Sequence, residues 1–200
     1  MNAATALDVY REHARELGRK YDAVRSGDVL APVAAFLPPP PARILDIGAG
    51  TGRDAVWLAD RGYLVTAAEP TEEFRETIRG RERGIVVIDA ALPRLDGIEG
   101  AFDLVLGNAV WHHVPSGGRN AALERIAALL APGGRAVLSL RLGPAMPELG
   151  TFALDPDREI QRTEAAGFTL LHRAEAPSHQ AGNIAAGVTW TWLVLEPEAT

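Results

Sequence analysis

The stretch RILDIGAGTG, residues 43–52, decides the fold. Its apolar first half predicts a buried strand, and the segment from about residue 51 to Gly62 predicts a helix with one apolar face. Glycines between these two elements let the backbone turn tightly, and they let a ligand lie directly against the backbone beside helical N–H groups. The stretch therefore predicts a strand–turn–helix unit that binds a polar ligand at its turn.

Short apolar runs alternate with longer amphipathic segments along the rest of the chain, which is typical of a Rossmann-like, doubly wound α/β fold. Further strands are predicted at 63–68, 85–88, 102–106, 136–140, 168–172 and 188–195. Helices are predicted at 5–20 with an end near Gly18, at 27–37, at 71–80, at 118–130 before Pro132-Gly133-Gly134, and at 157–166.

The length of 200 residues predicts a single domain. Residues 1–41 are expected to form an N-terminal helical cap and a proline-rich connector, since Pro38–Pro41 cannot continue a helix. Residues 42–141 are expected to form the ligand-binding core. Residues 142–200, which begin with a loop rich in Pro and Gly at 142–156, are expected to complete the sheet.

The composition excludes several classes of site. The chain has no cysteine, so disulfides, zinc–thiolate sites and thiolate nucleophiles are ruled out. The net charge of −6, with basic and acidic residues interspersed, disfavours a nucleic-acid partner. No apolar run reaches the length of about 20 residues that a bilayer requires, and the charged N-terminal sequence does not match a signal peptide, so a cytoplasmic location without membrane contact is expected.

The spacing of the glycines separates two classes of ligand. A dinucleotide fingerprint has the pattern G-x-G-x-x-G, whereas this turn reads G-x-G-x-G and has Arg53 where the third glycine belongs. No Walker lysine follows the turn either. An NAD-dependent oxidoreductase and a nucleoside-triphosphate site are therefore disfavoured.

Polar residues end the strands that follow the turn. Glu69 ends the second predicted strand, where a carboxylate can accept both hydroxyls of a ribose. Asp89 ends the third strand and suits an exocyclic amine of adenine, or else a plain turn or N-cap. Asn108 follows the fourth strand, where ligands of open parallel sheets bind. Together these residues favour an adenosine-containing ligand.

At this point the chain resembles the class I S-adenosylmethionine-dependent methyltransferase family, over roughly residues 42–141. The resemblance is carried by three segments in order, ILDIGAGTGRDAVWLADRGYLVTAAEP (44–70), IVVIDAALPRL (85–95) and LERIAALLAPGGRAVLSL (123–140). It implies a mostly parallel seven-stranded sheet whose last strand is antiparallel, helices on both faces, S-adenosylmethionine as cofactor and S-adenosylhomocysteine as product. The positions that it implies for cofactor binding are Asp46, Gly48, Ala49, Gly50, Gly52, Glu69, Pro70, Asp89, Ala90 and Asn108.

The resemblance also implies that the N-terminal segment covers the acceptor substrate, with Tyr10, Tyr21 and Arg25 as candidate pocket residues. His112 and His113 are candidate general bases after the fourth strand, because imidazole titrates near neutral pH. The alternative is that this loop only packs against the core. A metal site is not expected, since the histidines lack a ligand spacing.

Two absences bear on the acceptor. The stretch Asn108-Ala109-Val110-Trp111 departs from the Asn/Asp-Pro-Pro-aromatic tetrad common in enzymes that methylate amino groups of DNA bases. Carbon methylation of pyrimidines through a cysteine is impossible here. We therefore expect a small-molecule acceptor of unknown identity; the alternative is a non-catalytic cofactor-binding or regulatory module with the same fold.

Overall fold

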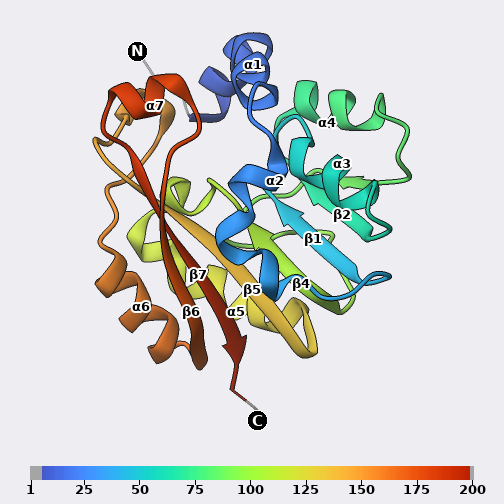
Figure 1. The fold of residues 1–200 in the computed structure, drawn as a ribbon, viewed down its shortest axis with the longest axis vertical. Coiled ribbons are helices and arrows are strands. Elements are labelled where there is room, and N and C mark those ends of the chain that lie inside the picture. Colours follow the sequence, from blue (N-terminus) through green and yellow to red (C-terminus); the bar gives the residue numbers. More distant parts are fainter. Residues whose placement is uncertain (1–5, 199–200) are drawn as a thin grey trace.

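The computed structural model describes residues 6–198, and in this part of the chain seven strands form one sheet (Figure 1). The strands are β1 (Arg43–Ile47), β2 (Leu64–Ala68), β3 (Val86–Ile88), β4 (Phe102–Gly107), β5 (Leu130–Leu142), β6 (Phe168–Pro177) and β7 (Thr189–Pro197). Their order is β3-β2-β1-β4-β5-β7-β6, and β7 is antiparallel to both of its neighbours while β1 to β5 are parallel. The predicted doubly wound sheet with an antiparallel last strand is confirmed.

Helices cover both faces of the sheet. On one face, α5 (Arg119–Leu129) and α6 (Pro156–Ala165) pack against the core that contains Leu45. On the other face, α2 (Ser26–Val29), the 3₁₀ helix η1 (Ala31–Phe36) and α3 (Arg53–Ala59) pack against the core that contains Ile44. Successive residues of a strand point to opposite faces, so the unbroken apolar run of β1 supplies both cores.

Three further helices lie at the end of the molecule toward which β1 points (Figure 1). These are α1 (Ala6–Asp22), α4 (Glu72–Arg79) and α7 (Ala181–Ala185). The helix α1 contacts both α4 and the short 3₁₀ helix η4 (Pro147–Leu149). The N-terminal helix is thereby placed over the carboxyl ends of the parallel strands, where ligands of such sheets bind.

The N-terminal helix differs from its prediction because it continues through Gly18 to Asp22. A Cβ atom at Gly18 would lie 3.1 Å from Cγ2 of Thr51, in the glycine turn. Glycine at this position therefore allows α1 to approach the turn closely and does not end the helix. The side chains of Asp22 and Thr51 then join the two segments by a hydrogen bond of 2.6 Å.

Several other boundaries were predicted wrongly. The helix expected at 27–37 is divided into α2 and η1, because Pro32 has no N–H group to continue the ladder of α2. Helix α5 ends at Leu129, and β5 begins at once, with an irregularity that contains Pro132–Gly134 before regular pairing resumes at Arg135. The strand β6 continues five residues beyond its predicted end, and α7, which was not predicted, caps the β6–β7 hairpin.

Candidate cofactor and acceptor site

The glycine turn between β1 and α3 is a backbone concavity. Gly48, Gly50 and Gly52 have φ angles of 67°, 56° and 79°, in the left-handed region that favours glycine. The amide groups of Gly48 and Ala49 donate to the carbonyl oxygen of Ala68, at 2.8 and 3.2 Å, which ties the turn to the end of β2. The turn thus has a fixed shape that depends on glycine at three positions.

Glu69 lies directly against this turn. Its Oε2 atom accepts a hydrogen bond from the N–H of Gly50 at 2.8 Å, and its Oε1 atom accepts one from the N–H of Thr71 at 2.8 Å. Burial raises the pKa of this carboxyl group, and the two backbone donors act in the opposite direction. Each oxygen keeps a further lone pair, so Glu69 can accept hydrogen bonds from two adjacent hydroxyl groups.

Asp46 carries a buried oxygen without a partner. Its side chain lies under the turn, and Oδ2 makes no hydrogen bond in the described part of the chain. Burial and then the nearby carboxylate of Asp54 raise its pKa well above the usual range. Buried acceptors are normally satisfied, so this atom suits a ligand that brings its own hydrogen-bond donor, such as an amino group.

Asn108 is held in place by a polar network. Its Nδ2 atom donates to Asp54 at 2.8 Å, and its Oδ1 atom accepts from the hydroxyl group of Ser139 at 3.0 Å. Asp54 is also paired with Arg53 at 2.8 Å, and Ser139 Oγ accepts from the N–H of Ala109, whose φ angle is 56°. A non-glycine residue in this region is strained, and such strain is concentrated at functional sites.

The sequence analysis did not identify Asp54 and Ser139. Asp54 gave only a weak local signal, since an acidic residue is common in the first turn of a helix. Ser139 had no local signal, since it lies in the middle of an apolar strand and meets Asn108 only across the sheet.

The three residues predicted to border the adenine differ in their exposure and contacts. Asp89 is 68% exposed and pairs with Arg75 at 3.0 Å, and Arg75 also donates to the carbonyl oxygen of Glu69 at 2.9 Å. Ala90 is buried, whereas Pro70 is half-buried. The structure therefore joins the ends of β2 and β3 through Arg75, while the carboxylate of Asp89 is turned toward that arginine.

The N-terminal helix contributes two tyrosines to the site. The ring of Tyr21 lies over the turn, since a Cβ atom at Gly50 would be 3.6 Å from Tyr21 Cδ2. The hydroxyl group of Tyr10 is 3.1 Å from Nε2 of His113. Burial raises the pKa of both phenols, which keeps them neutral at pH 7. Arg25, the third pocket candidate, is exposed.

His112 and His113 lie in the 3₁₀ helix η2 (Trp111–His113), with their ring centres 4.4 Å apart. Burial lowers the pKa of His112 to about 2, and the neighbouring His113 acts in the same direction. Burial also lowers the pKa of His113. Both rings are therefore neutral at pH 7. Within residues 6–198, no cluster of His, Asp and Glu is arranged to hold a metal ion.

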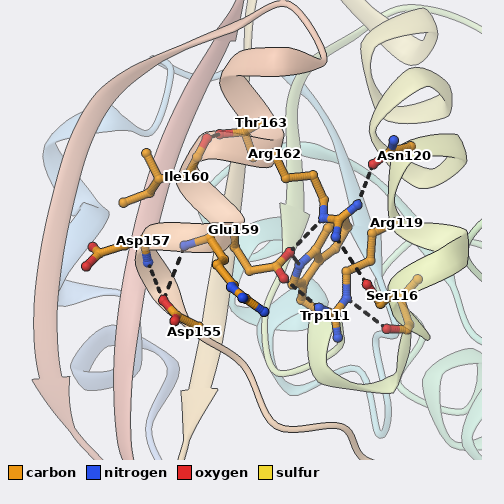
Figure 2. A network of polar contacts seen from close by, with 12 residues as sticks. Trp111, Ser116, Arg119, Asn120, Asp155, Asp157, Glu159, Ile160, Arg162 and Thr163 are labelled. Atoms are coloured by element: carbon orange, nitrogen blue, oxygen red, sulfur yellow. Dashed lines mark hydrogen bonds and ion pairs between the residues drawn. The ribbon is translucent and has the colours of Figure 1, made fainter.

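A buried polar network anchors η2 to the helices α5 and α6 (Figure 2). Glu159 accepts hydrogen bonds from Nε1 of Trp111 at 2.9 Å and from Arg119 at 2.5 Å, and all three side chains are at least nine-tenths buried. Arg162 approaches the same carboxylate at 3.6 Å. Trp111 thus has a structural contact that fixes the position of the two histidines that follow it.

A small cavity of about 50 Å³ lies beside Asn108 and Ala109. It is lined on its far side by Trp190 and Trp192 of β7 and by residues 176–180. This wall comes from the C-terminal hairpin, which the sequence analysis did not assign to the site.

The sheet order, the concave glycine turn and the facing carboxylate define a Rossmann-like protein with a binding site at the carboxyl ends of β1, β2 and β4. Residues 44–134 match a family described as "Methyltransferase domain". An uncharacterized methyltransferase of Mycobacterium tuberculosis is 32% identical over 122 residues, which are 61% of this chain and 46% of that protein. The chain spans about half the length of the curated relatives that it matches.

Two solved structures extend the likeness to the whole fold. The Burkholderia thailandensis 1,6-didemethyltoxoflavin-N1-methyltransferase, solved with 1,6-didemethyltoxoflavin and S-adenosylhomocysteine, has a TM-score of 0.67 at 23% identity and covers 100% of this chain and 93% of its own. A [4+2]-cyclase has a TM-score of 0.74 at 15% identity, with coverages of 99% and 98%. The family match places residues 44–134 in this methyltransferase-domain family, and the two solved structures, at 23% and 15% identity, add a likeness of fold.

No helix within residues 6–198 is both long and apolar enough to cross a bilayer.

Proposed function

We propose that this protein binds S-adenosylmethionine and transfers its methyl group to a small-molecule acceptor, with S-adenosylhomocysteine as product. The observation that carries the proposal is the convergence of three groups at one edge of the sheet. The carboxylate of Glu69 meets the N–H of Gly50 at 2.8 Å, and Oδ2 of Asp46 is buried beneath the same turn without a partner. A carboxylate for a ribose and an acceptor for an amino group are what this cofactor requires.

The residues of the turn fit the cofactor in shape and in donor chemistry. The concave backbone of Gly48, Ala49, Gly50 and Gly52 would lie under the methionine part, with Asp46 receiving its amino group. Glu69 would accept the ribose hydroxyls. Pro70, Ala90 and Asp89 would border the adenine, and Asp89 would do so after turning from Arg75. Asn108 would hold the end of β4 against the methionine part through its contact with Asp54.

The cofactor supplies a methyl group on a positively charged sulfur, whose departure needs no proton. The protein must therefore align the acceptor and exclude water, and orientation alone can contribute about 7–11 kcal/mol in favourable cases. Tyr21 and Tyr10 close the site from α1. Of the two histidines, His113 is the better proton acceptor, because the pKa of about 2 for His112 makes that ring a very weak base.

A small-molecule acceptor agrees with the acidic net charge of −6, which disfavours nucleic acid, and with the substrate named for the Burkholderia neighbour. The walls of the acceptor side are short segments of this chain, namely α1, η2 and residues 176–180.

Titration calorimetry with S-adenosylhomocysteine tests the proposal. The protein should bind it, and Glu69→Lys should weaken binding at least 100-fold, because a cation replaces the acceptor of the ribose hydroxyls and of the Gly50 N–H. Glu73→Lys makes the same charge change on the exposed side of α4 and should bind within threefold of the parent protein. Absence of binding by the parent protein, or unchanged binding by Glu69→Lys, would contradict the proposed site.

A second candidate is a protein of the same fold that binds the cofactor without methyl transfer. Two observations favour it: both histidines of η2 have lowered pKa values, and a [4+2]-cyclase shares the fold with a TM-score of 0.74. The two candidates are separated by incubating the protein and S-adenosylmethionine with a small-molecule extract. Formation of S-adenosylhomocysteine above the extract-free rate supports the transferase.

A further inference from the structure

Arg141 is a buried cation at the acceptor side of the site, near the carboxyl end of β5. Arg141 is 6% exposed, and its Nη1 atom donates a hydrogen bond to the carbonyl oxygen of Pro144 at 2.7 Å. Among the side chains that the structure describes, no carboxylate contacts the guanidinium group. Most of the five N–H donors of this group are therefore left for another partner.

The other buried arginines show how unusual this is. Among the described residues, Arg75 and Arg119 are buried to the same degree as Arg141. Arg75 is paired with Asp89 at 3.0 Å, and Arg119 with Glu159 at 2.5 Å. Buried charges in folded proteins are normally paired, because removal from water without a counter-ion is strongly unfavourable. Arg141 is the exception within the described chain.

The surroundings of Arg141 are basic and aromatic. It pairs in register with Trp190 of β7, which lines the cavity beside Asn108 and whose ring lies 6.0 Å from that of His112. The positive charge of Arg141 lowers the pKa of both His112 and His113, so both rings lie within its electrostatic field. The charges of Arg141 and Glu69 also both act on the hydroxyl group of Tyr10. A cation, two neutral imidazoles and an indole are therefore neighbours here, and among the described side chains no carboxylate contacts the cation.

We propose that Arg141 binds a carboxylate group of the methyl acceptor, so that the substrate of this enzyme is a small carboxylic acid in its ionised form. This inference rests on the proposed function and names the class of its acceptor. The planar guanidinium group matches the two oxygens of a carboxylate with parallel hydrogen bonds, and the match orients the ligand as well as holding it. The cofactor also contains a carboxylate, so the test must separate the two sources.

The first measurement uses the parent protein saturated with S-adenosylhomocysteine. Acetate and benzoate are titrated into this complex, and acetamide, benzamide and inorganic phosphate are titrated in parallel. Both carboxylates should bind at least tenfold more tightly than their amides. Equal binding of acids and amides, no binding of either carboxylate, or tighter binding of phosphate than of both would each overturn the proposal.

The second measurement uses variants of β5. Arg141→Gln keeps an amide donor for the carbonyl of Pro144 but loses the charge, and it should weaken benzoate at least tenfold while S-adenosylhomocysteine binds within threefold. Arg141→Lys keeps the positive charge but loses the planar guanidinium group, so its affinity for benzoate should lie between those of the parent protein and Arg141→Gln. Arg135→Gln, the same change six residues earlier in the same strand, should leave benzoate binding unaltered.

The two sources of carboxylate are separated by 5′-methylthioadenosine, which lacks the amino-acid part of the cofactor. If Arg141→Gln weakens S-adenosylhomocysteine at least tenfold and leaves 5′-methylthioadenosine unchanged, Arg141 holds the cofactor and the proposal is wrong. If the parent protein binds S-adenosylhomocysteine but no carboxylate, the acceptor class is wrong and the proposed function stands. If the parent protein does not bind S-adenosylhomocysteine, both are refuted.

Discussion

The two halves of the site are built in different ways. At the ends of β1, β2 and β3, the polar groups are placed by the backbone: Gly50 lies in the turn after β1, Glu69 directly follows β2, and the two meet through a main-chain N–H. On the acceptor side, η2, α1 and the end of β5 are held by side chains that reach across the fold, such as Glu159 to Trp111 over 48 residues. The cofactor half can therefore be predicted from local sequence, whereas the acceptor half becomes visible only in the three-dimensional structure.

The largest effect that would sharpen this contrast is expected from Glu159→Ala. The substitution leaves the buried guanidinium group of Arg119 without its counter-ion and the buried indole N–H of Trp111 without an acceptor (Figure 2). Removing one partner of a buried pair typically costs about 3–5 kcal/mol, so the free energy of unfolding in urea should fall by that amount. Affinity for S-adenosylhomocysteine should stay within threefold, because the network touches only the acceptor half.

The matched control is Glu164→Ala, which removes the same charge from the exposed face of the same helix and should change stability by less than about 0.5 kcal/mol. Equal losses from the two variants would show that the network does not hold η2. A large loss of cofactor affinity in folded Glu159→Ala would show that the two halves are coupled.

A smaller effect is expected from Gly48→Ala in the cofactor half. The φ angle of 67° is strained for alanine by roughly 1–2 kcal/mol, and the new Cβ atom would lie 2.8 Å from Cγ2 of Val110. Overpacking adds roughly 1–3 kcal/mol, so urea unfolding should show a loss of roughly 2–5 kcal/mol. Gly84 has the same φ angle with open space around it, so Gly84→Ala should lose only the stability that corresponds to backbone strain. Equal losses at the two positions would remove the argument from close packing.

The same contrast explains how far the sequence analysis reached. The alternating strands and helices were predicted because apolar runs and glycine turns are local signals, and the antiparallel last strand was implied by the family resemblance. The roles of Asp46 and Glu69 remain predictions, but their positions around Gly50 are as expected. Arg141 was overlooked, because on paper it is one arginine at the end of an apolar strand. That no described carboxylate contacts Arg141 can be seen only once the fold shows which residues surround it.

Gly18 and α7 show the same limit in the fold itself. Gly18 was taken as a helix end from a local preference, whereas its function depends on Thr51, which is distant in sequence. The hairpin that contains α7 was underestimated because β6 alternates with charged residues on an exposed face, and only pairing with β7 extends it to Pro177. Tertiary contacts decided both outcomes.

The smallest effect concerns the pH dependence of stability in the acceptor half. His112 has a pKa of about 2 in the folded protein, against an ordinary value of 6.5 in the unfolded chain. Below pH 6.5 the unfolded chain therefore binds a proton that the folded protein does not, so this group's contribution to stability is complete above pH 6.5 and is lost as the pH falls from 6.5 toward 2. Linkage gives a loss of about 1 kcal/mol between pH 6 and pH 5.

Urea unfolding at pH 6 and pH 5 checks this loss by difference, because His112→Phe removes the group while all other titrations remain. The stability of the parent protein should fall by about 1 kcal/mol more than that of the variant over this interval. His113→Phe should change the slope in the same direction, since burial lowers that pKa too. If neither substitution reduces the dependence of the unfolding free energy on pH, the two rings are hydrated in solution. The acceptor half would then be more accessible to water than the buried positions of these rings indicate.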